Sequence, residues 1–121
     1  MGSRYTINAR NPFLKTELDR PAIIEAFGSR NWSSNLQELI FEYIGIKLDV
    51  AEKDYCSFHL PDLKEACTKA ESLFEEAYAC DTSNHRATMV LKYIKEYNVI
   101  ETLRLMKELQ SIGLEISLSC G

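Results

Sequence analysis

The stretch IGLEISL (residues 112–118) has the same design as IGIKLDV (residues 44–50): an apolar residue, a glycine, and then apolar residues at every second position. Glycine often takes the left-handed conformation that ends an α-helix, and alternation of apolar and polar residues is the period of a strand with one buried face. Each stretch therefore predicts a helix that ends near the glycine and a strand that follows it. The repetition indicates that one design is used twice along the chain.

Two other segments alternate in the same way. Residues 5–9 (YTINA) predict a first strand. Residues 55–60 (YCSFHL) predict a strand that pairs with residues 46–50 as a hairpin, because only the short polar segment 51–54 separates the two. Together with residues 114–120, these segments give four predicted strands.

Four segments have helical signals. Residues 19–28 are expected to form a helix, because Pro21 fits a first turn, where its missing N–H costs nothing. Ser34 and Gln37 have capping-box spacing and begin a second helix. Residues 62–78 carry an apolar stripe at helical spacing, with Asp62 as the cap. Residues 86–112 continue in helical pattern, but Asn98 is a poor helix former, so this region is predicted to be kinked or split there.

These elements predict a single α+β domain over residues 1–121. The order strand, helices, strand, used twice, matches a ferredoxin-like sandwich of two split β-α-β units. In that fold a four-stranded antiparallel sheet has its first and third strands at the centre and helices over one face, and here each crossover holds extra helical pieces. An irregular α+β layer with the same elements is the alternative.

The composition, with 45% hydrophobic and 26% charged residues, is that of a globular protein. No apolar run approaches the roughly 18 residues that cross a bilayer, and no signal-peptide pattern opens the chain. We therefore expect a cytoplasmic protein that does not bind membranes. The net charge is −4 and no basic stripe accompanies the aromatic residues, so we expect no nucleic-acid partner.

The four cysteines and two histidines are the residues best suited to carry chemistry. Cys56 and His59 are three apart in a predicted strand, so their side chains point to opposite faces and cannot ligate one metal. Cys56, Cys67 and Cys120 fall on apolar faces, where free cysteine acts as a small buried hydrophobe. We therefore predict no metal site and no cofactor.

Cys80 and His85 differ because they flank the polar loop 81–84. A cysteine near a histidine, with Asp81 beside it, supplies the groups of an activated nucleophile or a redox thiol. No glycine-rich phosphate loop and no hydrolase motif accompanies them. The sequence favours a protein that is not an enzyme, with a thiol-based enzyme or redox protein centred on Cys80 and His85 as an alternative.

Two sets of residues are predicted to bind a protein partner. Trp32 and Arg30 share a polar turn and have the composition of a binding hot spot. An acidic surface is formed by Glu65, Glu71, Glu75, Glu76 and Asp81, and complementary charge would orient a basic partner on it. The resulting hypothesis is a small acidic interaction module of the inhibitor or immunity-protein type, which covers a basic site such as that of a nuclease. A small-molecule-sensing regulatory domain is the other alternative.

Overall fold

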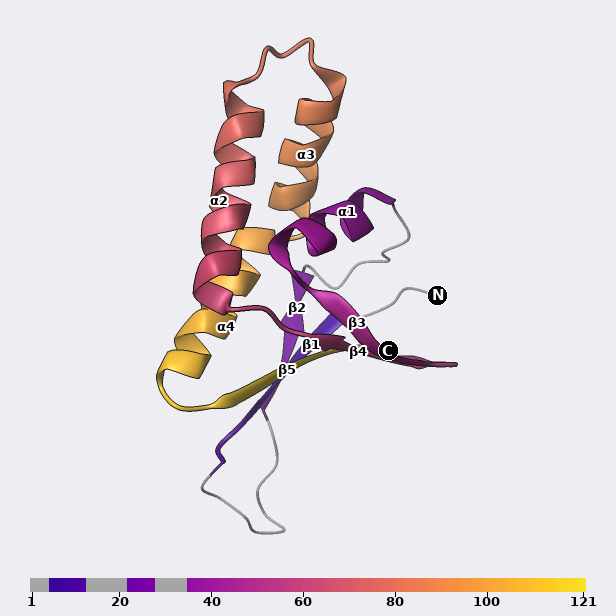
Figure 1. Cartoon of the computed structure of the whole chain (residues 1–121), viewed down its shortest axis with the longest axis vertical. Coiled ribbons are helices and arrows are strands. Elements are labelled where there is room, and N and C mark those ends of the chain that lie inside the picture. Colours follow the sequence, from indigo (N-terminus) through magenta and orange to yellow (C-terminus); the bar gives the residue numbers. More distant parts are fainter. Residues whose placement is uncertain (1–4, 13–21, 28–34) are drawn as a thin grey trace.

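The computed structural model of the chain describes residues 5–12, 22–27 and 35–121. Within these ranges the chain forms a five-stranded sheet and four α-helices (Figure 1). In chain order the elements are β1 (Tyr5–Arg10), β2 (Ala22–Ala26), α1 (Asn35–Ile44), β3 (Lys47–Glu52), β4 (Tyr55–His59), α2 (Leu63–Ala79), α3 (His85–Glu96), α4 (Val99–Ser111) and β5 (Glu115–Cys120). No helix in the described ranges is long and apolar enough to cross a membrane.

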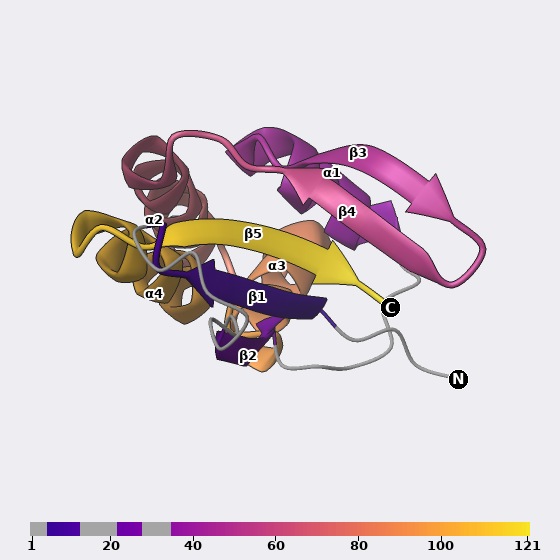
Figure 2. The same ribbon diagram turned by 90° about the horizontal axis from the view of Figure 1, so that it is seen from below.

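The strands lie in the order β2-β1-β5-β4-β3, and every neighbouring pair is antiparallel. The C-terminal strand β5 is therefore central, with the β1–β2 hairpin on one side and the β3–β4 hairpin on the other. Figure 2 shows the helices behind one face of this sheet, which we call the helix-covered face. No described helix covers the opposite face, which we call the open face.

The predicted α+β class and antiparallel sheet are confirmed, but the four-stranded sheet is wrong because β2 adds a fifth strand. The ferredoxin-like topology is not confirmed. It requires the first and third predicted strands at the centre, whereas β5 lies between β1 and β4. The two hairpins are joined through the C-terminal strand instead of pairing directly with each other.

The helix predicted over residues 19–28 is wrong, because β2 occupies Ala22–Ala26. Its residues pair with β1, for example Ile24 with Ile7 and Ala26 with Tyr5. Two adjacent isoleucines favour a strand over a helix once a partner strand is present, because β-branched side chains pack well on a pleated surface. Phe27 follows with a positive φ of 53° and is fully buried.

The repeated helix-glycine-strand design is confirmed at both positions. Gly45 and Gly113 have φ values of +90° and +94°, in the left-handed region that glycine enters without steric cost. In both turns the N–H after the glycine donates to a carbonyl five residues earlier: Ile46 to Phe41 at 2.9 Å and Leu114 to Leu109 at 3.2 Å. These bonds are those of the Schellman motif, which ends α1 and α4 in the same way.

The other helix boundaries agree with their sequence signals. The Asp62 carboxylate caps α2 by accepting hydrogen bonds from the N–H groups of Lys64 and Glu65 at 2.9 and 3.1 Å. Asn98 takes the left-handed conformation, with φ 48° and ψ 44°, and separates α3 from α4. The split predicted at Asn98 is therefore confirmed. Ser34 lies outside the described residues.

The core lies between the helix-covered face and the helices. Four aromatic rings meet there with centroid separations of 5.2–6.0 Å, contributed by Tyr5, Phe27, Phe41 and Phe58. The three cysteines predicted to lie on apolar faces are found at this core. Cys67 and Cys120 are buried in it, and the half-buried Cys56 packs against it. Burial raises the pKa of the Cys67 thiol, which keeps it protonated and unreactive.

Candidate functional site

The acidic residues predicted on α2 are partly paired with cations. Glu71 accepts two hydrogen bonds from Arg104 of α4 on the same carboxylate oxygen, Oε1, at 2.7 Å from Nη2 and 3.1 Å from Nε. Glu65 lies 3.4 Å from Lys69, one turn further along α2. Both pairs are solvent-exposed, so they contribute little to stability. Their main effect is to make this surface mixed in charge instead of uniformly acidic.

A groove of about 370 Å³ lies between α2, α3 and α4, and we call it the helical groove. Its apolar floor is formed by Phe74, Ile94 and Ile100. Its charged residues are Glu71, Glu75, Glu101, Lys95 and Arg104. Lys95 places Nζ 5.8 Å from the centroid of the Phe74 ring, a cation–π distance. Among the described residues, Glu75 and Glu101 form no ion pair within 4.0 Å, although Glu101 is close enough to Arg104 to help raise the pKa of that guanidinium.

The end of α2 continues this surface. The Tyr78 ring is 72% exposed and stacks on Phe74, with centroids 6.4 Å apart and planes 15° apart. Glu76 is also exposed, but it lies two positions from Tyr78 on the helix and therefore faces another side. Asp81 accepts hydrogen bonds from the Ser83 N–H at 3.1 Å and the Thr82 hydroxyl at 3.5 Å, and the bonds from Ser83 lower the pKa of its carboxyl group. Asp81 therefore shapes the loop after α2 and also stays ionised.

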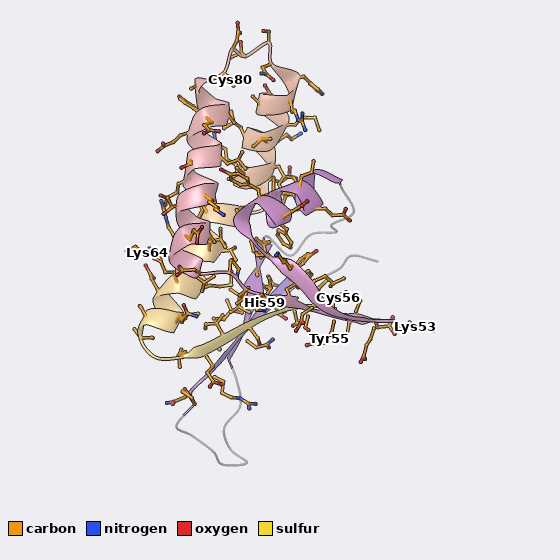
Figure 3. All side chains as sticks on the ribbon, viewed as in Figure 1. Lys53, Tyr55, Cys56, His59, Lys64 and Cys80 are labelled. Carbon is orange, nitrogen blue, oxygen red and sulfur yellow. The ribbon has the colours of Figure 1, made fainter. Side chains whose placement is uncertain are left out.

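Cys80 and His85 flank the tip of the α2–α3 hairpin, where Figure 3 labels Cys80. Cys80 ends α2, and its Sγ donates to the backbone carbonyl of Glu76 at 3.3 Å. His85 begins α3, which Asn84 caps by accepting a hydrogen bond from the Ala87 N–H at 3.1 Å. The thiol is thus directed to its own helix, and no hydrogen bond joins it to the imidazole.

The structure brings together only part of the predicted site. Trp32 and Arg30 lie outside the described residues. Cys56 and His59 are directed to opposite faces of β4, as expected: Cys56 packs against the core and His59 is exposed. In the part of the chain that the structure describes, no three histidine, cysteine or acidic side chains are placed to hold a metal ion.

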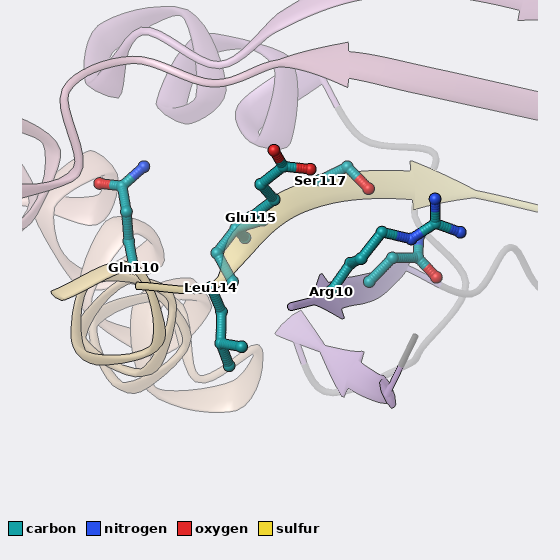
Figure 4. Close-up of a pocket in the computed structure, with 7 residues that line it drawn as sticks. Arg10, Gln110, Leu114, Glu115 and Ser117 are labelled. Atoms are coloured by element: carbon teal, nitrogen blue, oxygen red, sulfur yellow. The ribbon is translucent and has the colours of Figure 1, made fainter. Parts of the chain in front are cut away.

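A hollow of about 700 Å³, which the sequence did not predict, lies where β1, β5 and the end of α4 meet (Figure 4). Its polar residues include Arg10 and Asn8, which lie opposite Glu115 and Ser117 in the β1–β5 pair. Gln110 of α4 lines the other side. In residues 8–10 and 115–117 every second residue is polar, and these polar residues line the hollow. The sequence does not predict the hollow, because it does not show that β1 and β5 are neighbours.

Comparison of the chain with protein-family models, curated proteins and solved structures finds no match.

Proposed function

We propose that the chain is a non-catalytic interaction module of the cytoplasm that binds a basic protein partner through the helical groove and the exposed end of α2. The observation that supports this proposal is the composition of the groove. It combines an apolar floor with Glu75 and Glu101, whose carboxylates form no ion pair with another described residue. Such a combination suits the long side chain of a lysine or an arginine, which has an apolar stem and a charged end.

The partner's cation would approach Glu75 and Glu101 while its methylene groups pack on Phe74 and Ile100. Arg104 holds Glu71 by two hydrogen bonds, so this carboxylate of the groove is already paired. Tyr78 offers an exposed aromatic ring at the same end of α2, and tyrosine is enriched among residues that dominate binding energy. A module of this kind would act as an inhibitor or immunity-type protein by covering a basic site.

The test is binding after charge reversal in the groove. Full-length protein and the double variant Glu75→Lys/Glu101→Lys would be used as baits in extract of the native host, and the partner's affinity would then be measured by calorimetry at low and high salt. We expect a basic protein that binds wild type, weakens with salt and is lost with the double variant. The matched control Glu38→Lys/Glu42→Lys changes the same charge on the exposed face of α1 and should retain binding.

The proposal fails if the captured partner binds the groove variant as well as wild type, or if its affinity does not depend on salt. Loss of binding in both double variants would indicate an effect of net charge alone. Circular dichroism and the melting temperature of each variant separate these results from misfolding.

A second candidate function, small-molecule sensing, is favoured by the hollow at the end of β1 and β5. Arg10 is the cation among the described residues that line it, and with Asn8, Ser117 and Gln110 it would suit a small anionic ligand that binds away from the Glu115 carboxylate, which also lines the hollow. A panel of carboxylates and phosphates would test this function by melting temperature, since a ligand that binds only the folded state raises it. The Arg10→Ala variant should remove any such rise, and a rise that it retains would place the ligand elsewhere.

A further inference from the structure

Strand β3 has one edge that no other described strand pairs with. Among the described strands it pairs with β4 alone, and all six of its residues are exposed. Five of the eight exposed large hydrophobic residues in the described ranges lie on α1, β3 or β4: Leu39, Tyr43, Leu48, Val50 and Tyr55. An exposed strand edge with apolar side chains is where a further strand can add to a sheet. Figure 3 shows the end of this hairpin, at Lys53 and Tyr55, extending away from the helices.

A register shift changes which residues of β3 share a face. Lys47 lies opposite His59, Val50 opposite Ser57 and Glu52 opposite Tyr55, while Leu48 lies opposite Phe58 and Ala51 opposite Cys56. The shift between Leu48 and Val50 leaves Asp49 as an extra residue. Lys47 and Glu52 are five positions apart and would lie on opposite faces of a regular strand. Because of the extra residue, both lie on the open face.

We propose that β3 is an interface with a second copy of this chain, in which the two β3 strands pair antiparallel around a two-fold axis. Lys47 then lies opposite Glu52 of the second copy, and Leu48 lies opposite Ala51. The members of each pair share a face, so the two sheets continue as one and both helical layers stay on the same side. An ion pair forms at each end of the strand pair, and opposite charges at directly facing positions are favourable.

The charges of β3 select this register. A shift by one position in one direction places Asp49 opposite itself, and a shift in the other direction places Lys47 opposite Lys53, the first residue of the turn after β3. Both place like charges face to face, which is unfavourable. Charged residues and bulges on edge strands commonly prevent pairing with other proteins. In β3 the charged residues and the bulge disfavour pairing with most other strands, but they match the β3 strand of a second copy in one register.

Apolar exposure on the same side of the sheet supports this occupant. Leu48 faces the helix-covered side and is still 58% exposed, so the described helices do not cover it. Helix α1 leads directly into β3 (Figure 1), and Leu39 and Tyr43 are exposed one turn apart on it. A two-fold axis at β3 brings the α1 helices of the two copies towards each other and offers these side chains apolar contacts.

The experiment is sedimentation of the full chain over a range of concentrations, with single and paired charge reversals. We expect wild type to shift from the monomer mass to twice that mass as concentration rises. Lys47→Glu and Glu52→Lys each create like-charge pairs at both ends and should weaken dimerisation by about tenfold. The double variant Lys47→Glu/Glu52→Lys restores opposite charges and should dimerise like wild type.

Lys69→Glu, on α2, is the control that should leave dimerisation unchanged. Wild type that stays monomeric at every concentration, single reversals without effect, or a double variant that does not recover would each overturn the proposal. The groove variant Glu75→Lys/Glu101→Lys should keep the wild-type mass, so failure of this interface is distinguishable from failure of the proposed partner binding.

Discussion

Cys56 of β4 and Cys120 of β5 lie directly opposite each other in neighbouring antiparallel strands. Cys120 is 8% exposed, and Cys56 is half-buried beside the core. Opposite residues in antiparallel strands have Cα atoms about 4.5–5.5 Å apart, which lies within the span of roughly 4.4–6.8 Å that a disulfide bridges. The fold therefore holds two thiols of widely separated residues in a position where an oxidant can join them.

We predict that oxidised glutathione converts this pair to a disulfide. Each cysteine loses a hydrogen as the S–S bond forms, and one oxidised glutathione becomes two reduced molecules. The experiment uses a Cys80→Ser background, because the exposed Cys80 thiol would otherwise form an adduct. Intact mass should fall by about two mass units and unfolding should become harder. The loop-entropy model gives about 4 kcal/mol as the upper limit of the increase in the free energy of unfolding, for a loop of about 65 residues.

Cys56→Ser in the same background is the control and should show no loss of mass. Peptide mapping identifies the linked residues. An unchanged mass after oxidation, or glutathione attached separately to Cys56 and Cys120, would contradict the prediction.

A second prediction concerns the hydrogen bond between Phe27, which follows β2, and α4. The Phe27 N–H donates to the Thr102 hydroxyl at 3.1 Å, and both residues are buried. Thr102→Val keeps the shape of the side chain but removes the acceptor of this buried hydrogen bond. The free energy of unfolding should fall by about 1–3 kcal/mol, measured by urea denaturation. Thr102→Ser keeps the hydroxyl and should lose less, so equal losses in the two variants would show that the hydroxyl is not responsible.

The elements predicted correctly are those whose signals are local. Gly45, Gly113 and Asp62 each end or cap a helix through bonds to residues within five positions, so their roles can be recognised from neighbouring sequence. β2 was missed because Pro21 resembles a helix start, while the pairing that decides its conformation comes from β1. The central place of β5 was missed for the same reason: strand order depends on contacts between distant residues, which alternation does not specify.

The candidate site shows the same limit. The acidic residues of α2 can be predicted as exposed from helical periodicity, but Arg104 is 33 positions from Glu71 and reaches it only because α2 and α4 pack together. Helical periodicity gives the face of each helix and does not give the neighbouring helix. The helical groove therefore could not be predicted from the sequence, because its lining residues come from three helices whose packing the sequence does not specify.

A third prediction concerns the left-handed residue between α3 and α4. Asn98 has φ 48°, a conformation that asparagine and glycine tolerate better than other residues. Asn98→Ala should lower the free energy of unfolding by about 1 kcal/mol, because the alanine Cβ is strained there. Asn98→Gly should stay close to wild type. The comparison is made by thermal and urea unfolding, and an alanine variant as stable as the glycine variant would show that alanine is not strained at position 98.

The last prediction concerns alkaline pH. Burial raises the pKa of the Tyr93 hydroxyl well above its usual value, and the neighbouring Tyr97 and Tyr5 add to the shift. An unfolded tyrosine ionises near pH 10, so above about pH 10 the unfolded chain binds fewer protons at this position than the folded chain. Above about pH 10 the free energy of unfolding should therefore fall as pH rises, by up to about 1.4 kcal/mol per pH unit. Below about pH 10 the Tyr93 hydroxyl should not affect how stability depends on pH.

Urea unfolding at a series of pH values measures this slope. Tyr93→Phe keeps the ring that lies 4.6 Å from that of Tyr97 but removes the titrating hydroxyl, so its slope above about pH 10 should be smaller than that of wild type. Tyr78→Phe is the matched control, because Tyr78 is 72% exposed, and it should keep the wild-type slope. Equal slopes for wild type and Tyr93→Phe would show that the buried hydroxyl reaches solvent and ionises without unfolding the chain.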